Sequence, residues 1–403
     1  QDSSFAGNKT AQGNQDGNSI GDFYYAPPTG FLALCTSNLP DVAVVPSEHF
    51  NTITYSGNST NRTLTGVGFT PSFTWIKSRS NATNGSDHFL FDAVRGVNAF
   101  KGLCSNGTSV EGETAAGSAQ ENFGDISAFT SDGYSVYRST ADPSHQYEAV
   151  NNNSETYVAW NWKANGSGSS NTNGSTNSTV SANTDAGFSI VSYTGSSGPD
   201  TIGHGLSKAP EMIIVKDRSS AQEWLVYHHS LTDAKDKYLR LDTTSAVADN
   251  TFWNDTAPTN QVFSVGDSQP VNSGHGDSYI AYCFHSVDGY SKVGTYIGNN
   301  NDDGTFVYTG FRPKWIMVKS SSVGGNHYDW AIYDTARSSY NAVGNVLEAN
   351  QSQAEVTGTG RGLPIDIVSN GFKHRSGYAE NNSDKTYIYI AFAETPFKYS
   401  NAR

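Results

Sequence analysis

Two aspartates and a histidine each end one of three similar short segments of this sequence. Asp92 and Asp334 each end a short aromatic segment, and His228 ends the corresponding third segment. A pair of carboxylates across a cleft could hydrolyse a glycosidic bond. The glutamates, however, are scattered without paired spacing, so we expect solvated carboxylates and no catalytic residue. The glutamates considered are Glu111, Glu113, Glu121, Glu211, Glu223, Glu348, Glu355, Glu380 and Glu394.

Histidine, serine and cysteine give no stronger catalytic pattern. His204 and the pair His228–His229 would need distant partners to bind a metal ion, and the sequence has no Gly-x-Ser-x-Gly turn in a strand–helix pattern. The cysteines Cys35, Cys104 and Cys283 are an odd number without metal-ligand spacing. We predict buried small side chains rather than a disulfide framework, no cofactor and no enzyme activity.

One turn has the composition of a calcium loop. Asn300–Gly304 reads Asn-Asn-Asp-Asp-Gly, which offers oxygen ligands and a turn glycine. It lacks the full ligand spacing and a distal bidentate glutamate. We therefore expect a solvated turn and no metal site.

Aromatic residues in predicted loops are the candidates for ligand binding. Tyrosine rings could stack on sugar rings while Asn and Asp supply hydrogen bonds, although the same rings could cap the edges of β-sheets. Loops of Gly, Asn, Ser and Tyr are typical of adaptable binding surfaces and also of merely soluble loops. The pattern therefore leaves the ligand-binding residues unassigned. The tyrosines considered are Tyr134, Tyr137, Tyr147, Tyr328, Tyr340 and Tyr378.

Asn-x-Ser/Thr triplets would be glycan acceptors in a eukaryotic secreted protein. In a chain this rich in the three residue types, chance produces many such triplets, and we favour chance. They begin at Asn8, Asn58, Asn61, Asn81, Asn84, Asn106, Asn152, Asn165, Asn173, Asn177, Asn254, Asn350 and Asn381.

These residues are positioned by a strand-like run that occurs three times. Pro71–Lys77, Pro210–Lys216 and Pro313–Lys319 each begin with proline and reach lysine six residues later, with mainly apolar and β-branched residues between. Proline suits the first residue of a strand, because its missing N–H cannot join an interior ladder. The apolar filling is typical of a buried strand. Three copies indicate an internal repeat.

Each copy has the same neighbours in the same order. A Tyr-x-Gly turn and a Gly-hydrophobic pair precede the run, a second strand follows it, and an aromatic strand closes the unit. Four landmarks in a fixed order indicate a tandem array. The turns begin at Tyr55, Tyr193 and Tyr296, and the closing strands are Tyr157–Trp162, Tyr279–Phe284 and Tyr387–Phe392.

The amino-acid composition indicates the fold class and argues against one kind of partner. With 40 glycines, 16% charged and 12% aromatic residues, the chain is expected to form short strands joined by polar turns rather than to be disordered. A net charge of -13 argues against nucleic acid as a partner. No apolar run approaches the roughly 20 residues that span a bilayer. We predict an all-β protein: three tandem antiparallel β-sandwich repeats, jelly-roll or lectin-like, after a short N-terminal arm.

The repeats set the expected boundaries. Residues 1–46 are an N-terminal arm or the end of a preceding domain, and residues 47–165, 185–292 and 293–403 are the three repeats. Residues 166–184 are almost wholly Asn, Ser, Gly and Thr and are expected to form a linker. The first repeat should then be mobile relative to the second and third, which have no spacer between them.

The second and third repeats resemble a known family. Val307–Pro313, Asp366–Phe372 and Tyr387–Tyr399 are similar to repeat domains in structural proteins of tailed phages, especially aquatic phages and cyanophages. His204–Leu206 and Ala209–Lys216 resemble the same family, and the first repeat matches it more loosely.

The segment Phe31–Pro40 resembles the connection between such repeats and an upstream lectin-like β-sandwich. The resemblance therefore covers nearly the whole chain. It implies a tail-fibre-like protein on the virion surface, outside the cell, in contact with other virion proteins. It supplies no catalytic residues.

We expect non-enzymatic adhesion to a host-surface glycan, and fibre behaviour suggests a homotrimer. Two alternatives stay open: a capsid-decoration or filament subunit without a ligand, and, less favoured, a glycan depolymerase.

Overall fold

A computed structural model describes residues 10–33, 35, 38, 44–82, 86–138, 147–356 and 364–394. The chain divides into two compact units, residues 1–43 and residues 44–403. The named strands pair antiparallel, and the helices among the described residues are short 3-10 turns. None of these helices is long and apolar enough to cross a bilayer. The predicted all-β class is confirmed.

The N-terminal unit folds around Asp16. The Asp16 carboxylate accepts hydrogen bonds from the backbone N–H groups of Asn18 (2.9 Å), Ile20 (3.0 Å) and Ala33 (2.7 Å) and from the side-chain amide of Asn38 (2.6 Å). Desolvation raises the pKa of Asp16, but these hydrogen bonds lower it to about 2. The described part of the predicted N-terminal arm is therefore a hydrogen-bonded loop rather than an extended segment.

Strand group 1 comprises β1 to β8. A five-stranded sheet has the order β1-β8-β3-β4-β5, and a three-stranded sheet has the order β2-β7-β6. The elements are η2 (Pro46–Glu48), β1 (Phe50–Ser56), β2 (Arg62–Leu64), β3 (Phe73–Ser78), β4 (Phe89–Asp92), β5 (Leu103–Cys104), η3 (Gln120–Asn122), β6 (Asp125–Thr130), β7 (Gly133–Tyr137) and β8 (Thr156–Trp162).

Strand group 2 comprises β9 to β18. Its large sheet has the order β16-β15-β14-β13-β18-β11-β10-β9, and β12 pairs with β17 in a small sheet. The elements are β9 (Ser169–Asn171), β10 (Ser178–Asn183), β11 (Phe188–Thr194), β12 (Asp200–Gly203), β13 (Met212–Asp217), β14 (Leu225–His228), η4 (Ala234–Asp236), β15 (Lys237–Arg240), β16 (Ala248–Asp249), η5 (Thr251–Trp253), β17 (Val262–Val265) and β18 (Ser278–Phe284).

Strand group 3 comprises β19 to β26. Its sheets have the orders β19-β26-β21-β22-β23 and β20-β25-β24. The elements are β19 (Ser291–Ile297), β20 (Phe306–Tyr308), β21 (Pro313–Ser320), β22 (Ala331–Asp334), β23 (Leu347–Glu348), β24 (Ile365–Val368), β25 (Gly371–His374), η7 (Ala379–Asn381) and β26 (Thr386–Ala393).

The predicted linker, residues 166–184, is not a linker. It contains β9 and β10, and β10 pairs with β11 along six residues, from Ser178 opposite Tyr193 to Asn183 opposite Phe188. Composition missed these strands because the segment is polar on its exposed face, while Val180 and Ser181 are buried against the sheet. A low-complexity sequence can form strands when an existing sheet edge supplies the hydrogen bonds.

The large sheets of the three groups share one order of five strands. β1-β8-β3-β4-β5 of group 1 corresponds to β11-β18-β13-β14-β15 of group 2 and to β19-β26-β21-β22-β23 of group 3. The repeated Pro-to-Lys runs form β3, β13 and β21, each hydrogen-bonded on both sides and buried along nearly its whole length. Burial on both faces explains why these runs are apolar without alternation.

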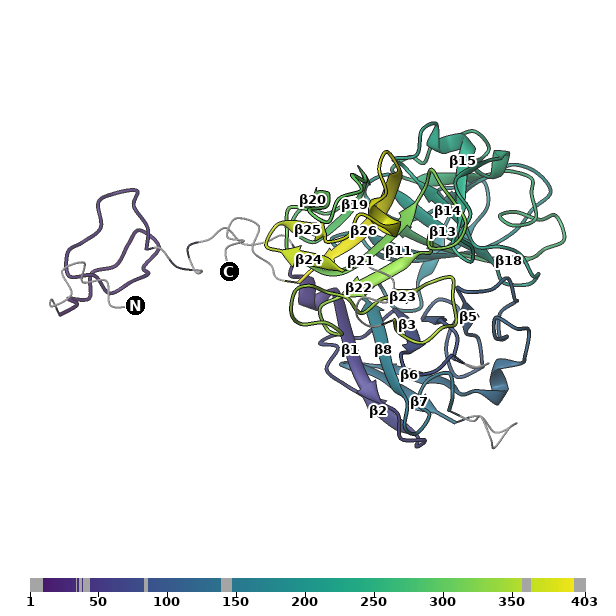
Figure 1. Ribbon diagram of the computed structural model, residues 1–403, viewed down its shortest axis with the longest axis horizontal. Helices are drawn as coiled ribbons and strands as arrows, with labels where there is room; N and C mark the ends of the chain where they lie inside the picture. The colour runs from purple at the N-terminus through teal and green to yellow at the C-terminus, as the bar shows by residue number, and fades with distance from the viewer. Residues whose placement is uncertain are drawn as a thin grey trace. The chain divides into compact units, whose positions relative to one another are not determined.

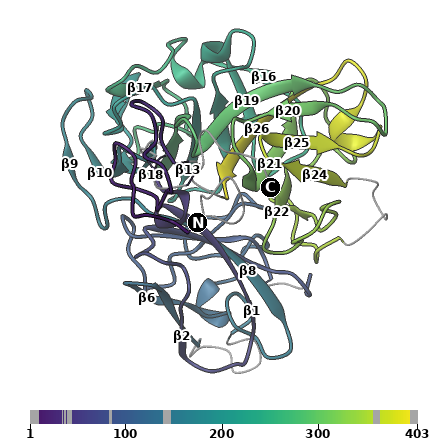
Figure 2. The ribbon, with the colours of Figure 1, turned by 90° about the vertical axis from the view of Figure 1, so that its left-hand side faces the viewer.

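Each large sheet packs against two cores. One face packs with the small sheet of its own group, which gives each group a separate sandwich-like cluster. The other faces of all three large sheets meet in one shared cluster. Figure 2 shows the three groups around this common centre, with β1 and β8 below, β13 and β18 above to the left, and β21 and β26 to the right. The predicted independent movement of residues 47–165 is therefore wrong, because their sheet supplies one side of the shared core.

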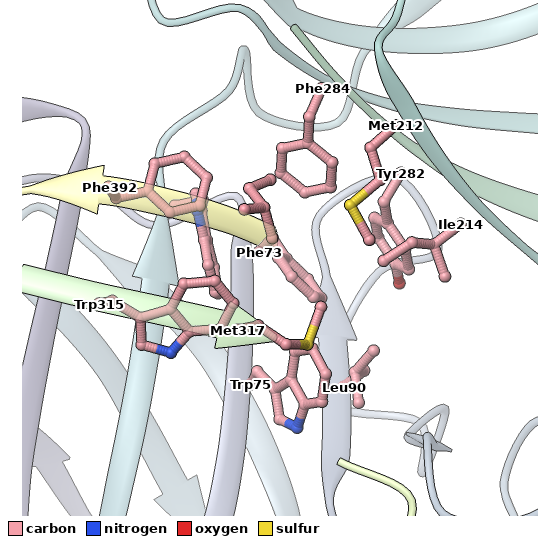
Figure 3. A pocket seen from close by; sticks show the side chains of 12 residues that line it. Phe73, Trp75, Leu90, Met212, Ile214, Tyr282, Phe284, Trp315, Met317 and Phe392 are labelled. Atoms are coloured by element: carbon pink, nitrogen blue, oxygen red, sulfur yellow. The ribbon is translucent and has the colours of Figure 1, made fainter. Parts of the chain in front are cut away.

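A small apolar cavity of ≈ 20 Å³ lies where the three groups meet. The two methionines of the chain, Met212 and Met317, line it together with aromatic side chains from all three groups (Figure 3). Methionine is flexible enough to fill the irregular space between rings. In each Pro-to-Lys run, the second and fourth residues after the proline line this cavity. They are Phe73, Trp75, Met212, Ile214, Trp315 and Met317.

Substitution of Phe392, which lies in the shared core, tests whether the three groups unfold together. Its ring lies 5.1 Å from that of Phe50, 5.6 Å from that of Trp162 and 6.1 Å from that of Phe284. We predict that Phe392→Ala lowers the free energy of unfolding by about 3–5 kcal/mol and shifts a single calorimetric transition for residues 44–403. The control Phe306→Ala, at a side chain 47% exposed, should change the stability by roughly 0.5 kcal/mol or less. A second transition from one group alone would contradict the shared core.

Candidate functional site

The carboxylates considered for catalysis lie at contacts between groups. The Asp92 carboxylate bonds to Arg95 Nε at 2.5 Å and accepts a hydrogen bond from the Tyr282 hydroxyl of group 2 at 2.8 Å. The Asp334 carboxylate bonds to Arg337 Nε at 2.5 Å and accepts one from Trp160 Nε1 of group 1 at 3.0 Å. Both aspartates are fully buried. We expected solvated carboxylates, but these two are buried and are not exposed to a substrate.

Two of the three lysines that end the repeated runs, Lys216 and Lys319, also reach neighbouring groups. Lys77, Lys216 and Lys319 are fully buried. Lys216 Nζ donates a hydrogen bond to the carbonyl of Thr108 in group 1 at 3.1 Å, and Lys319 Nζ donates one to Thr244 in group 2 at 3.2 Å. Each lysine also donates to the carbonyl of the next residue in its own strand.

Two glutamates complete this set of contacts. Glu111 of group 1 bonds to Arg218 of group 2 at 2.6 Å, and Glu355 of group 3 bonds to Arg79 of group 1 at 2.8 Å. The backbone repeats the contact, because the Glu111 N–H donates to the Arg218 carbonyl and the Glu355 N–H donates to the Arg79 carbonyl. Group 2 thus contacts group 1, and group 1 contacts group 3.

The third contact runs from group 3 to group 2. Trp330 Nε1 of group 3 donates to the carbonyl of Arg240 in group 2 at 2.8 Å, as Trp224 Nε1 of group 2 donates to Cys104 in group 1 at 2.9 Å. All three pairs of groups are therefore joined by polar contacts. The sequence could not predict these contacts, because each partner lies far away along the chain.

Histidines and the acidic turn lack the geometry of a metal site. Burial lowers the pKa of His228 to about 3 and that of His204 to about 4. His204 Nδ1 accepts a hydrogen bond from the Leu206 N–H at 3.1 Å. In the acidic turn, Asp303 pairs with Lys373 at 2.5 Å. Over the described ranges, no three His, Cys, Asp or Glu side chains are grouped to hold a metal ion.

The cysteines and predicted binding tyrosines differ in burial. Cys104 and Cys283 are buried and free, as predicted, and Cys35 is free and partly exposed. Tyr134 and Tyr147 are buried, so neither can stack on a sugar. Tyr340 is 85% exposed and Tyr378 is 49% exposed. The remaining two, Tyr137 and Tyr328, are half-buried.

Tyr137 lines a groove on the described surface. This groove has a volume of ≈ 410 Å³ and lies over the small sheet of group 1. Its volume is within the usual range of small-ligand sites. Its lining residues come from β2, β6, β7 and the loops beside them and are Asn61, Arg62, Thr63, Asn98, Ser127, Ser135, Val136 and Tyr137. We call it the group 1 groove.

The group 1 groove combines an aromatic ring with polar side chains. Tyr137 packs beside Phe100, with ring centroids 5.5 Å apart, and its hydroxyl lies 3.5 Å from Asp125. Burial raises the pKa of Asp125 to about 6. Asn98 is exposed, and the buried Arg62 Nε has no hydrogen-bond partner among the described residues. An aromatic face next to amide, hydroxyl and guanidinium groups can bind a neutral polar ligand such as a sugar.

Sequence reasoning named Tyr137 but missed the other groove residues. The outward positions of β2 and β7 alternate with buried ones, and this alternation was the available signal. It could show that these residues share a polar face. It could not show that Asn98, which follows β4, lies beside them.

One protein family matches most of the chain. The model of a domain family of unknown function, DUF7483, matches residues 45–396. The chain belongs to this family. The match spans all three strand groups, in agreement with their shared core. No curated protein and no solved structure matches the chain.

The buried lysines predict how stability depends on pH. Burial lowers the pKa of Lys77 and Lys319 to about 7 and that of Lys216 to about 8. An unfolded lysine has a pKa of about 10.4, so between these values the unfolded chain binds protons that the native chain lacks. The free energy of unfolding should therefore rise from pH 7 to pH 9.5, by about 1.4 kcal/mol per pH unit for each neutral lysine.

Denaturant titrations at several pH values measure this slope. Lys319→Met should remove the contribution of one lysine, whereas Lys292→Met, at an exposed lysine of β19, should leave the slope unchanged. If Lys319→Met and the wild-type protein share the same slope, Lys319 is charged in the native state.

Proposed function

We propose that residues 44–394 are three copies of one β-sandwich unit closed into a ring, and that this ring is a non-enzymatic adhesion module on a virion surface. The equal strand orders and the contacts joining each pair of groups support the repeat. The sequence resemblance to phage structural proteins supports the location and contact with other virion proteins. A homotrimer stays a prediction.

The group 1 groove is the proposed glycan site, and its pairing of Tyr137 with polar side chains carries the proposal. A sugar has an apolar face of C–H groups and a rim of hydroxyls. Tyr137 would contact the apolar face, and Asn98 and Arg62 would bond to the hydroxyls. The low charge of the chain, 16%, suits a neutral ligand better than an anionic polymer.

Absence of catalysis is part of the proposal. The paired carboxylates that a glycosidase needs would have to face a cleft. Asp92 and Asp334 are instead buried and bonded to arginines. The Asp125 carboxylate, 3.5 Å from the Tyr137 hydroxyl, accepts a hydrogen bond from the Phe100 N–H at 2.7 Å.

A second candidate is a structural virion subunit without a glycan ligand. It is favoured by the exposed apolar side chains of group 3, among them Ile297, Phe306 and Tyr308. A protein-contacting face would suit a capsid-decoration or filament subunit. The two candidates place their binding surfaces on different groups and can be separated by mutation.

A glycan array with the purified chain tests the groove. We predict that Tyr137→Ala and Asn98→Ala each weaken binding by about tenfold, the loss expected from roughly 1.4 kcal/mol of contact energy. The matched control Tyr340→Ala removes an exposed tyrosine of group 3 and should leave binding unchanged. Absence of binding by the wild-type chain, or equal binding by the groove variants, counts against the site. Release of reducing sugar from a bound glycan would contradict the non-enzymatic proposal.

A further inference from the structure

Exposed apolar side chains concentrate in one strand group. In the described part of residues 44–403, the exposed large hydrophobic side chains all belong to group 3. Ile297 (62% exposed), Phe306 (47%) and Tyr308 (65%) lie at adjoining strands, because the Thr305 hydroxyl donates to the Ile297 carbonyl at 2.9 Å. We call these three residues the group 3 edge.

The outer side of β20 has backbone N–H and C=O groups that are not used by its ladder with β25. β20 is an outer strand of the sheet β20-β25-β24 (Figure 1). Its ladder with β25 uses the carbonyl of Thr305, which accepts from His374, and the N–H of Thr309, which donates to Asn370. Antiparallel ladders use alternate residues. The N–H and C=O groups of Phe306 therefore point away from β25, toward the open edge.

The same edge of group 2 is covered by the chain itself. Ile202 of β12 corresponds to Val307 of β20, since each lies opposite a buried phenylalanine. Beside Ile202, the Thr201 N–H donates to the Ser175 hydroxyl at 2.8 Å, and the Thr176 N–H donates to the Thr201 carbonyl at 3.2 Å.

The covering segment approaches β12 very closely. A Cβ atom on Gly174 would lie 2.1 Å from the Thr201 carbonyl oxygen. The next residues continue as β10, which pairs with the outer edge of β11. Residues 174–183 thus occupy both strand edges of group 2 that correspond to the open edges of β19 and β20.

In group 1 the corresponding outer strand is β2, and its exposed side chains are polar. By register, Thr63 and Thr65 of group 1 take the places of Phe306 and Tyr308. Both threonines are exposed, and Arg62 adds a charge beside them. Polar and charged residues protect open edges from pairing with other chains. Among the described residues, the group 3 edge has neither a covering segment nor the polar replacement.

We propose that the group 3 edge binds an extended segment of another polypeptide by strand addition. The covering segment of group 2 is uncharged and consists mainly of Ser, Thr and Asn over residues 174–183. The exposed apolar side chains of the group 3 edge would in addition favour apolar residues at alternate positions of the added strand. Its backbone would pair with the outward groups of Phe306, and its apolar side chains would pack on Phe306, Tyr308 and Ile297. The proposal concerns group 3 and does not depend on the groove of group 1.

A second copy of this chain is the less suitable occupant. The segment of this sequence built to cover such an edge, residues 174–183, is already paired with group 2. The corresponding edge of group 1 offers only polar side chains. A different chain with a free strand meets the requirement without breaking an existing pairing.

The test uses fluorescein-labelled Ser-Val-Thr-Val-Asn-Val-Thr-Val-Ser and the full chain, followed by fluorescence anisotropy. Two control peptides have the same composition in scrambled order or N-methyl groups on alternate valines, which remove backbone donors. The variant F306T/Y308T carries the residues that group 1 has at these places, so the substitutions suit the fold. The matched control Tyr340→Thr changes an exposed tyrosine away from β19 and β20.

We expect saturable binding of the alternating peptide, at least about tenfold weaker for F306T/Y308T and unchanged for Tyr340→Thr. The N-methylated and scrambled peptides should bind at least about tenfold more weakly. No binding to the wild-type chain, equal binding to F306T/Y308T, or equal binding of the N-methylated peptide would overturn strand addition. Sedimentation velocity decides the occupant: a dimer abolished by F306T/Y308T would show that a second copy takes the edge. Equal denaturation midpoints of the variant and wild type establish that the substitutions leave the fold intact.

Discussion

The structure depends on three strands that are buried on both faces. β3, β13 and β21 each contribute alternate side chains to the core of their own group and to the core shared by all groups. A strand in this position can keep few polar groups, and most of them must be hydrogen-bonded because a buried polar group without a partner is costly. The lysines that end these strands meet this requirement by donating to backbone carbonyls.

This constraint explains why the polar residues of the chain are arranged as they are. Asp92, Asp334, two of the three repeated lysines and the pairs Glu111–Arg218 and Glu355–Arg79 join the groups. The group 1 groove lies on an outward sheet. The outer strand edges differ among the three groups: group 1 is polar, group 2 is covered by residues 174–183, and group 3 carries exposed apolar side chains.

The strands were predictable where periodicity and repetition agreed. Pro210–Lys216 could be recognised as a buried strand because its apolar run recurs twice elsewhere. Residues 166–184 could not, because their strands form by pairing with β11 rather than by propensity. The role of Asp92 was equally hidden, since its partner Tyr282 is 190 residues away along the chain. For the candidate site, sequence identified Tyr137 by residue type alone, and the groove depends on loop geometry that no local pattern encodes.

The three groups form one folded body around a shared core. Native-state hydrogen exchange measured by mass spectrometry tests it directly, strand by strand. We expect the amides of β3, β13 and β21 to exchange with the same free energy of opening, equal to that of global unfolding. A free energy several kcal/mol lower for β3 and β8 than for β13 and β21 would show that group 1 opens separately, and would contradict this expectation.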